Sequence, residues 1–268
     1  MGSREEKVAA FRDMHRAGCF VIPNPWDVGS AQVLAGAGFK ALATTSSGYA
    51  FSVGKPDGEA AIGRDEALAY AARIAAGVEV PVSADFEDGY GDTPEAVAET
   101  VRLAAEAGLA GMSVEDSNPR GPEPSRSIEA AAERVAAATE AARRHNVVLT
   151  ARADGMLHGS YGLDEAIDRL VRFADLGADV VFAPGIKTLD ELRRVCAAVD
   201  RPVNHLISVG TPGAGFAEVA AAGVRRISIG GALAMVAGAA LRNTGLRLME
   251  GDFAPIRGLP GWDALRGR

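Results

Sequence analysis

The sequence predicts a (β/α)8 barrel, in which eight parallel strands form a cylinder inside a ring of helices. A short β-type run followed by an Ala/Leu-rich amphipathic helix recurs eight times along 268 residues, and about 250 residues is the usual length of such a barrel. The strands are apolar on both faces, as at 180–183, which is typical of a parallel sheet covered by helices. The first strand-to-helix turn, at 23–29, lacks the Gly-x-Gly-x-x-Gly pattern of doubly wound dinucleotide-binding folds, which argues against that alternative.

Each element follows from this alternation. The expected strands cover residues 19–22, 41–45, 81–85, 111–116, 147–154, 179–184, 202–207 and 225–230. The expected helices cover residues 28–37, 64–76, 94–107, 128–145, 163–176, 188–199, 215–222 and 232–249, where apolar side chains recur at steps of three and four. Glycine closes several helices and predicts a left-handed final residue there, at Gly38, Gly77, Gly108, Gly177 and Gly223.

The chain is expected to form one barrel domain over residues 1–268. A barrel needs little after its eighth strand, so we expect residues 232–268 to be a C-terminal helix and tail that pack on a partner subunit. His15 and His145 fall on helices and are predicted to lie at the surface.

Composition excludes several classes of protein. There are 28 Lys and Arg residues against 35 Asp and Glu, a net charge of −7, which disfavours binding to nucleic acid because phosphates require a basic surface. Cys19 and Cys196 are the only cysteines, too few for a disulfide framework or a cysteine-rich zinc site. No segment has the pattern of a membrane span or a signal peptide, so we expect no membrane partner and a cytoplasmic location.

Polar side chains gather where the predicted strands end, which is where barrels place their active sites. Asp85 and Glu87 follow the third strand and would face the same way on an extended chain, and Glu115 ends the neighbouring strand. Carboxylates at close range repel one another and require a cation. Ligands that are all oxygens favour Mg²⁺, with Mn²⁺ as the alternative. The competing interpretation is a set of solvated carboxylates or helix caps, which suits Asp88 and Asp116 best.

Other polar groups at the strand ends allow two interpretations each. Arg152, on the fifth strand, is either a clamp for an anionic substrate or a partner in an internal ion pair with Asp154 or Glu115. The hydroxyl-rich turn at 45–48 either binds a carboxylate through its amides or is an ordinary turn. Glycine-rich segments at 210–215 and 230–231 occupy the usual phosphate position of a barrel without the spacing of a phosphate loop. No lysine lies within a strand, which argues against a Schiff-base aldolase.

Taken together, these segments resemble the isocitrate lyase/phosphoenolpyruvate mutase superfamily. The resemblance runs in order from about residue 8 to about residue 240. The motifs that carry it are Asn24-Pro25-Trp26-Asp27, Gly54-Lys55-Pro56-Asp57, Ala84-Asp85-Phe86-Glu87-Asp88-Gly89-Tyr90-Gly91, Val114-Glu115-Asp116, Thr150-Ala151-Arg152 and Pro202-Val203-Asn204.

The resemblance implies a Mg²⁺-dependent barrel whose last helix is exchanged between subunits, in a homodimer or homotetramer. It implies a substrate that is a small 2-oxo or 2-hydroxy carboxylate, with a C–C or P–C bond broken or formed beside the chelating group. By matching position, Asp85 would ligate the metal directly, Glu87 and Glu115 would act mainly through metal-bound waters, and Asp57 would anchor those waters or the substrate. Arg152 would stabilise the enolate. The substrate pocket would be formed by Trp26, Thr45, Ser46, Ser47 and Asn204.

The segment after the fourth strand, at 117–124, departs from the family pattern. It lacks the Cys that isocitrate and methylisocitrate lyases carry there, so neither activity is expected. The phosphonate enzymes carry a Lys and an Asn-Ser pair in this segment; here the Lys is missing, and only Asn118 with Ser117 or Ser125 could stand in for the pair. The leading hypothesis is a Mg²⁺-dependent C–C lyase or decarboxylase-type enzyme acting on a small dicarboxylate through an enolate. Phosphonate P–C chemistry is the alternative, and a non-catalytic carboxylate-binding protein is a third. The general acid or base is left open among Tyr49, Ser117, His158 and a metal-bound water.

Overall fold

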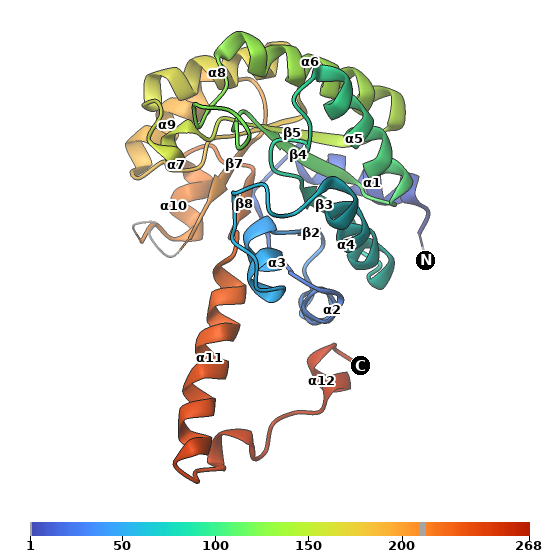
Figure 1. The fold of residues 1–268 in the computed structure, drawn as a ribbon, viewed down its shortest axis with the longest axis vertical. Coiled ribbons are helices and arrows are strands. Elements are labelled where there is room, and N and C mark those ends of the chain that lie inside the picture. The colour runs from blue at the N-terminus through green and yellow to red at the C-terminus, as the bar shows by residue number, and fades with distance from the viewer. Residues whose placement is uncertain (1, 209–212) are drawn as a thin grey trace.

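The computed structural model describes residues 2–208 and 213–268, and its core is one eight-stranded parallel sheet (Figure 1). The strand order is β1-β8-β7-β6-β5-β4-β3-β2, so that each strand pairs with its neighbour in sequence and β8 pairs with β1. The strands are β1 (Phe20–Ile22), β2 (Leu42–Ala43), β3 (Val82–Asp85), β4 (Gly111–Glu115), β5 (Val148–Arg152), β6 (Val180–Phe182), β7 (Val203–Leu206) and β8 (Arg226–Ser228).

Eight helices match the predicted alternation. They are α2 (Val28–Gly36), α4 (Arg64–Gly77), α5 (Pro94–Glu106), α6 (Ile128–His145), α8 (Leu163–Asp175), α9 (Leu189–Ala198), α10 (Phe216–Ala221) and α11 (Ala232–Met249). The structure adds five short elements that the sequence pattern did not predict: α1 (Arg4–Met14), α3 (Ser46–Ser52), α7 (Gly155–His158), the 3-10 helix η1 (Ala254–Ile256) and α12 (Trp262–Leu265).

Polar contacts close the cylinder between its two edge strands. The amide of Ala43, on β2, donates to the carbonyl of Pro23 at 3.1 Å. Asn24 donates to the carbonyl of Thr44 and accepts from the amides of Ile229 and Gly230, so it joins the ends of β1, β2 and β8. The predicted TIM barrel is therefore confirmed.

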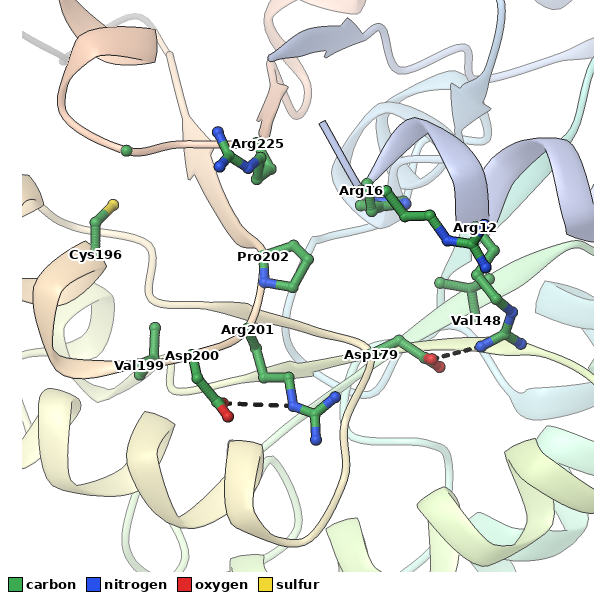
Figure 2. A pocket seen from close by; sticks show the side chains of 12 residues that line it. Arg12, Arg16, Val148, Asp179, Cys196, Val199, Asp200, Arg201, Pro202 and Arg225 are labelled. Atoms are coloured by element: carbon green, nitrogen blue, oxygen red, sulfur yellow. Dashed lines mark hydrogen bonds and ion pairs between the residues drawn. The ribbon is translucent and has the colours of Figure 1, made fainter. Parts of the chain in front are cut away.

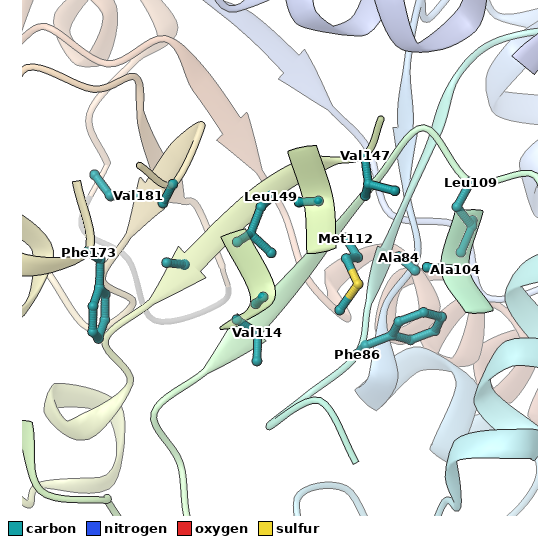
Figure 3. Packing of buried hydrophobic residues seen from close by; sticks show 14 of the residues in the cluster. Ala84, Phe86, Ala104, Leu109, Met112, Val114, Val147, Leu149, Phe173 and Val181 are labelled. Carbon is teal, nitrogen blue, oxygen red and sulfur yellow. The ribbon is translucent and has the colours of Figure 1, made fainter. Parts of the chain in front are cut away.

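The main hydrophobic core lies between the sheet and the helices (Figure 3). Met112 and Val114 of β4 and Leu149 of β5 are fully buried in it, together with Phe173 of α8. Because side chains alternate along a strand, the intervening residues face the barrel interior. The sequence therefore places apolar residues toward the helices and leaves Ser113 and Glu115 for the inside of the barrel.

Helix α1 closes the N-terminal end of the barrel. Its Val8 and Phe11 are buried in a second apolar cluster with Ile22 of β1 and with Val148 and Val180, the first residues of β5 and β6. A capping box formed by Ser3 and Glu6 starts the helix.

His15, just after α1, is buried, and the prediction of a surface position was wrong. Its ring makes edge contacts with Phe11 and Phe20, and its Nδ1 lies 2.8 Å from the carbonyl of Phe11. A histidine can be accommodated there because α1 covers it, and α1 was itself not predicted.

Gly77 also departs from its predicted role. Four of the five helix-closing glycines have positive φ, as the left-handed stop requires, but Gly77 does not and is the last residue of α4. A Cβ at Gly77 would lie 2.6 Å from Cγ1 of Val28. This glycine is therefore required by the close approach of α2 and α4.

The C-terminal segment leaves the barrel. Helix α11 projects away from it and has no buried residue (Figure 1). The chain then returns to α2, where Arg266 donates to the side chain of Gln32 at 3.1 Å. Apolar side chains are exposed along this segment, including Val236, Leu241, Met249 and Trp262. Within the described residues, no helix is both long enough and apolar enough to cross a membrane.

Candidate active site

Two adjoining cavities open at the carboxyl ends of the strands. The deeper one, of about 190 Å³, extends into the barrel as far as Ile22 and Ser83, and is called the shaft below. The shallower one, of about 210 Å³, lies under the segment that follows β4 and is called the rim cavity. Ser46, Asp57 and Arg152 line both. Polar groups that the sequence places on separate strands therefore surround one continuous site.

Arg152 forms ion pairs with three carboxylates of this site. Its guanidinium is 2.7 Å from Asp85, 3.0 Å from Glu115 and 2.6 Å from Asp154. It also lies over the ring of Phe182, 5.0 Å from the centroid. Although burial by itself would lower the pKa of Arg152, the three carboxylates raise it well above its ordinary value. The internal ion pair predicted as one alternative is present, and the same side chain also lines the cavity.

Asp85, the last residue of β3, is held from several sides. One carboxylate oxygen accepts from both the amide and the hydroxyl of Ser46, at 3.0 and 2.9 Å. The other accepts from Ser113 at 3.2 Å and from Arg152 at 2.7 Å. Its own amide donates to the hydroxyl of Thr44 at 2.9 Å. These contacts fix the orientation of the Asp85 carboxylate at the top of the shaft.

Glu87 reaches the rim cavity by a different route from the one predicted. Strand β3 ends at Asp85, and Glu87 has a left-handed backbone with φ of 43°, so the extended-chain argument for its orientation was wrong. Its carboxylate nevertheless lines the rim cavity and is 8% exposed as a residue. Burial, together with the charges of Asp85, Asp57 and Asp88, raises the pKa of Glu87 to about 7. A strained residue in a crowded acidic site is a feature of functional positions.

The hydroxyl-rich turn after β2 forms the start of α3. Thr45 caps that helix by accepting from the amide of Gly48, and its hydroxyl lies 3.0 Å from that of Ser47. Thr45, Ser46 and Ser47 all line the shaft. Gly231 faces Ser47, and a Cβ at Gly231 would lie 2.7 Å from its hydroxyl oxygen.

Asn204 also faces the shaft, as the family resemblance implies. It donates to Ser228 at 2.9 Å and accepts from Arg226 at 2.8 Å. His205 lines a different cavity outside the barrel, beside Ile186 and Leu192.

The structure does not bring Trp26 to the shaft or to the rim cavity. Trp26 lines a separate cavity of about 400 Å³ with Tyr49 and Tyr70, whose rings stack at 4.0 Å. The Tyr49 hydroxyl donates to Glu66 at 3.2 Å, in that same region. Of the candidate acid/base groups, Tyr49 thus lies apart from the cluster around Arg152.

Ser117 and His158, the other candidates, both line the rim cavity. Ser117 donates to Glu115 at 2.7 Å. Asp88 and Asp116 are instead buried in ion pairs. Asp88 contacts Arg120, Arg126 and Arg134. Asp116 accepts from Tyr161, Arg169 and the amide of Asp154. These two carboxylates therefore have structural partners and are buried, so the interpretation of them as solvated groups or helix caps was wrong.

A larger cavity, of about 470 Å³, lies at the opposite end of the barrel (Figure 2). Arg12 and Asp179 form an ion pair across part of it at 2.6 Å, and Arg201 pairs with Asp200 at 3.6 Å. In barrels the N-terminal ends of the strands serve stability, whereas catalysis occurs at the carboxyl ends. We therefore assign the site by its chemistry and not by cavity size.

The acidic groups suit a hydrated divalent cation. We call Asp57, Asp85, Glu87 and Glu115 the rim carboxylates. Among the described residues, Arg152 is the only cation that forms ion pairs with any of them. No group of three or more His, Cys, Asp or Glu side chains in the described parts of the chain converges as a ready-made chelate. Mg²⁺ fits this arrangement because it commonly retains several waters and binds through one or two carboxylates.

The comparison with known proteins identifies the family. The family model described as phosphoenolpyruvate phosphomutase matches residues 11–249. The chain belongs to the isocitrate lyase/phosphoenolpyruvate mutase superfamily. It is 45% identical to a Burkholderia cenocepacia protein assigned provisionally as a lyase or mutase, with a TM-score of 0.93 over 98% of this chain and 95% of that one.

Two solved lyase-type relatives cover nearly the whole chain. A 2,3-dimethylmalate lyase is 28% identical, with a TM-score of 0.87 over 100% of this chain and 96% of that one. An oxaloacetate acetylhydrolase bound to its product oxalate is 27% identical, with a TM-score of 0.86 over 99% and 96% of the two chains. The protein is thus a lyase of the isocitrate lyase/phosphoenolpyruvate mutase superfamily.

One prominent site residue of this superfamily member was not predicted. Arg226 lines the shaft, and it is buried. Most of the predicted site residues lie at the carboxyl ends of strands, whereas Arg226 begins β8. The available signal was a charged residue within a strand, the same signal that identified Arg152. The predicted glycine-rich phosphate position at 210–215 lies partly outside the described residues.

Proposed function

We propose that the protein is a Mg²⁺-dependent lyase or decarboxylase-type enzyme that cleaves a C–C bond in a small 2-oxo or 2-hydroxy dicarboxylate. The observation that carries the proposal is the concentration of four rim carboxylates around one arginine, in a site buried enough to raise the pKa of Glu87 to about 7. Such a surplus of negative charge is costly unless a cation offsets it.

Different residues would bind the metal, stabilise the enolate and contact the substrate. Asp85, Glu87 and Glu115 would hold the metal with Asp57 beside them, and Mn²⁺ would serve in place of Mg²⁺. When bound, the metal supplies a Lewis acid for the substrate oxygen. Arg152 faces the same space, and its fixed positive charge would stabilise the negative charge of an enolate as it develops. Thr45, Ser46, Ser47 and Asn204 would contact the substrate carboxylates, because they line the shaft next to Asp85.

The relatives support this choice of substrate class. One is a 2,3-dimethylmalate lyase and another is an oxaloacetate acetylhydrolase. The acid/base group is proposed to be Ser117, His158 or a water in the rim cavity, since these are the candidates that the structure places there.

A panel assay tests the reaction. The wild type and Arg152→Ala are incubated with Mg²⁺ and oxaloacetate, malate, citramalate, alkylmalates, methylisocitrate or phosphonopyruvate. We expect turnover of an oxo- or hydroxy-dicarboxylate, with methylisocitrate inactive, and loss of that turnover in the variant. The observation favouring phosphonate chemistry instead is Asn118, which lines the rim cavity where the phosphonate enzymes carry an Asn-Ser pair. Release of phosphate or phosphoenolpyruvate from phosphonopyruvate, without turnover of any dicarboxylate, would establish that alternative.

The metal assignment has its own test. Asp85→Ala should abolish the binding of Mg²⁺ with oxalate measured by calorimetry, because Asp85 is the carboxylate at the top of the shaft that Ser46 and Arg152 hold in a fixed orientation. Asp190→Ala, which removes an exposed carboxylate on α9, is the matched control and should bind as the wild type does. Unchanged binding to Asp85→Ala would overturn the metal site.

We also propose a homodimer or homotetramer assembled by exchange of residues 232–268. The support is the lack of any buried residue in α11 and the apolar side chains that this segment exposes. Each such side chain would be covered by a partner copy.

A further inference from the structure

Arg226 crosses the interior of the barrel below the active site. It begins β8, donates from Nε to Asn204 at 2.8 Å, and donates from Nη2 to the hydroxyl of Thr150, on β5, at 3.0 Å. Thr150 precedes Arg152 by two residues on the same strand, so both face inward and Thr150 lies one level deeper. The guanidinium of Arg226 therefore forms part of the floor of the shaft that Arg152 and Asp85 line at its top.

The charge of Arg226 has no counterion in the described part of the chain. Its hydrogen-bond partners are an amide and a hydroxyl, and no described carboxylate lies within 4.0 Å of it. The residue is 5% exposed, and its Nη1 atom is buried without a hydrogen-bond partner among the described residues. Arg134 and Arg169, by contrast, each contact a buried aspartate. A buried arginine without a counterion lowers the stability of the protein unless a ligand supplies the missing negative charge.

The surroundings of Arg226 suit an anionic ligand group. Ser83, Ser113 and Ala43 are small and leave the shaft open at this depth, and Ser228 adds a hydroxyl beside Asn204. Burial and the nearby Arg152 lower the pKa of Arg226 to about 9, which still leaves it charged at neutral pH. The top of the site is acidic and its floor is basic, so the shaft has opposite charges at its two ends.

We propose that Arg226 is the specificity residue for the second anionic group of the substrate. One end of the substrate lies among the rim carboxylates with their cation, and a carboxylate at the other end reaches the guanidinium at the floor, flanked by Asn204 and Ser228. This inference rests on the proposed function only for the end of the substrate that lies among the rim carboxylates. A phosphonate offers the same chemistry to an arginine, and it is distinguished by the test.

Ligands that differ in the second group test the assignment. Calorimetry with Mg²⁺ compares the wild type, Arg226→Met and Arg226→Lys toward oxalate, pyruvate, 3,3-difluorooxaloacetate and phosphonopyruvate. Oxalate and pyruvate can occupy the upper end alone, whereas the other two carry a further anionic group. Loss of a charge-assisted hydrogen bond predicts that Arg226→Met weakens binding of difluorooxaloacetate by about 10- to 100-fold. Binding of oxalate and pyruvate should change by less than about threefold, and Arg226→Lys should retain part of the preference.

Each outcome separates the two hypotheses. Equal weakening of all ligands, or of none, in Arg226→Met would show a structural role and overturn the inference while the proposed function stands. Failure of the wild type to bind oxalate with Mg²⁺ would overturn the proposed function, and the inference would still hold if difluorooxaloacetate binds and depends on Arg226. If only phosphonopyruvate depends on Arg226, the second group is a phosphonate and the dicarboxylate assignment is wrong. Thermal melting of each variant confirms that it folds.

Discussion

Replacing Arg152 by Met should destabilise the protein and make its stability depend more strongly on Mg²⁺. The variant removes the only cation among the described residues that pairs with Asp85, Glu115 and Asp154, whose side chains are 18%, 11% and 1% exposed. Removing one partner of a buried ion pair costs about 3–5 kcal/mol, because the remaining charges are left uncompensated. For a chain of this size that loss lowers the melting temperature by roughly 10 °C.

Mg²⁺ should restore a large part of that loss. A cation that binds only the folded state adds about 2.7 kcal/mol at a hundredfold excess over its Kd. Without the positive charge of Arg152, the rim carboxylates attract the ion more strongly, so the Mg²⁺-induced rise in melting temperature should be greater in Arg152→Met than in the wild type. Melting curves with and without Mg²⁺, at constant ionic strength, measure both effects.

Arg169→Met is the matched control. Arg169 is also buried and pairs with Asp116 at 2.9 Å, but its partners lie outside the two cavities. It should lose a similar amount of stability and gain no more from Mg²⁺ than the wild type does. If Mg²⁺ shifts the two variants equally, the rim carboxylates are not a cation site.

Two further predictions concern stability and assembly. Burial and the charge of Arg226 lower the pKa of His15 to about 3, so the unfolded state, with a pKa near 6.5, takes up the proton first as the pH falls. The wild type should therefore lose about 2 kcal/mol more stability than His15→Phe between pH 7 and pH 5, and parallel denaturant titrations at the two pH values that show no difference would contradict this. Leu241, on α11, is 76% exposed, and Leu241→Glu should shift the protein toward monomer in light scattering, whereas unchanged mass would argue against assembly through residues 232–268.

The barrel itself was predictable because its signals are local and repeated. Each strand has apolar side chains that pack against the helices, and each helix has its own periodic apolar stripe. The interior face is more polar than predicted, with Ser83, Ser113 and Asn204 lining the shaft. The sequence carried a weak signal for the unpredicted helix α1. Ser3 and Glu6 form a capping box at its start, but only Val8 and Phe11 of the helix are buried. Its importance lies in the tertiary structure, because it covers the open end of the cylinder.

The site was predictable to the extent that barrel geometry maps strand ends onto one rim. Asp85, Glu115 and Arg152 meet because adjacent parallel strands end side by side. Glu87 reaches the site because its backbone is left-handed, a conformation that no sequence pattern predicts for a glutamate. Arg226 lies at the start of its strand, away from the carboxyl ends, and it still lines the cavity because its long side chain spans the barrel from β8 to β5. How far a side chain extends across the barrel depends on its length, which the position of a residue along its strand does not indicate.

The two ends of the shaft make sense together. The four rim carboxylates beside one arginine are unfavourable for the folded chain alone. So is Arg226, a buried arginine that pairs with no carboxylate of the described residues. Arg226 cannot relieve the rim, because hydrogen bonds to Asn204 and Thr150 hold it at the floor. A cation at the top and an anion at the bottom would neutralise both. A metal chelated by one end of a dianionic acid meets both requirements, so the separation of charge along the barrel axis selects for ligand length as well as charge.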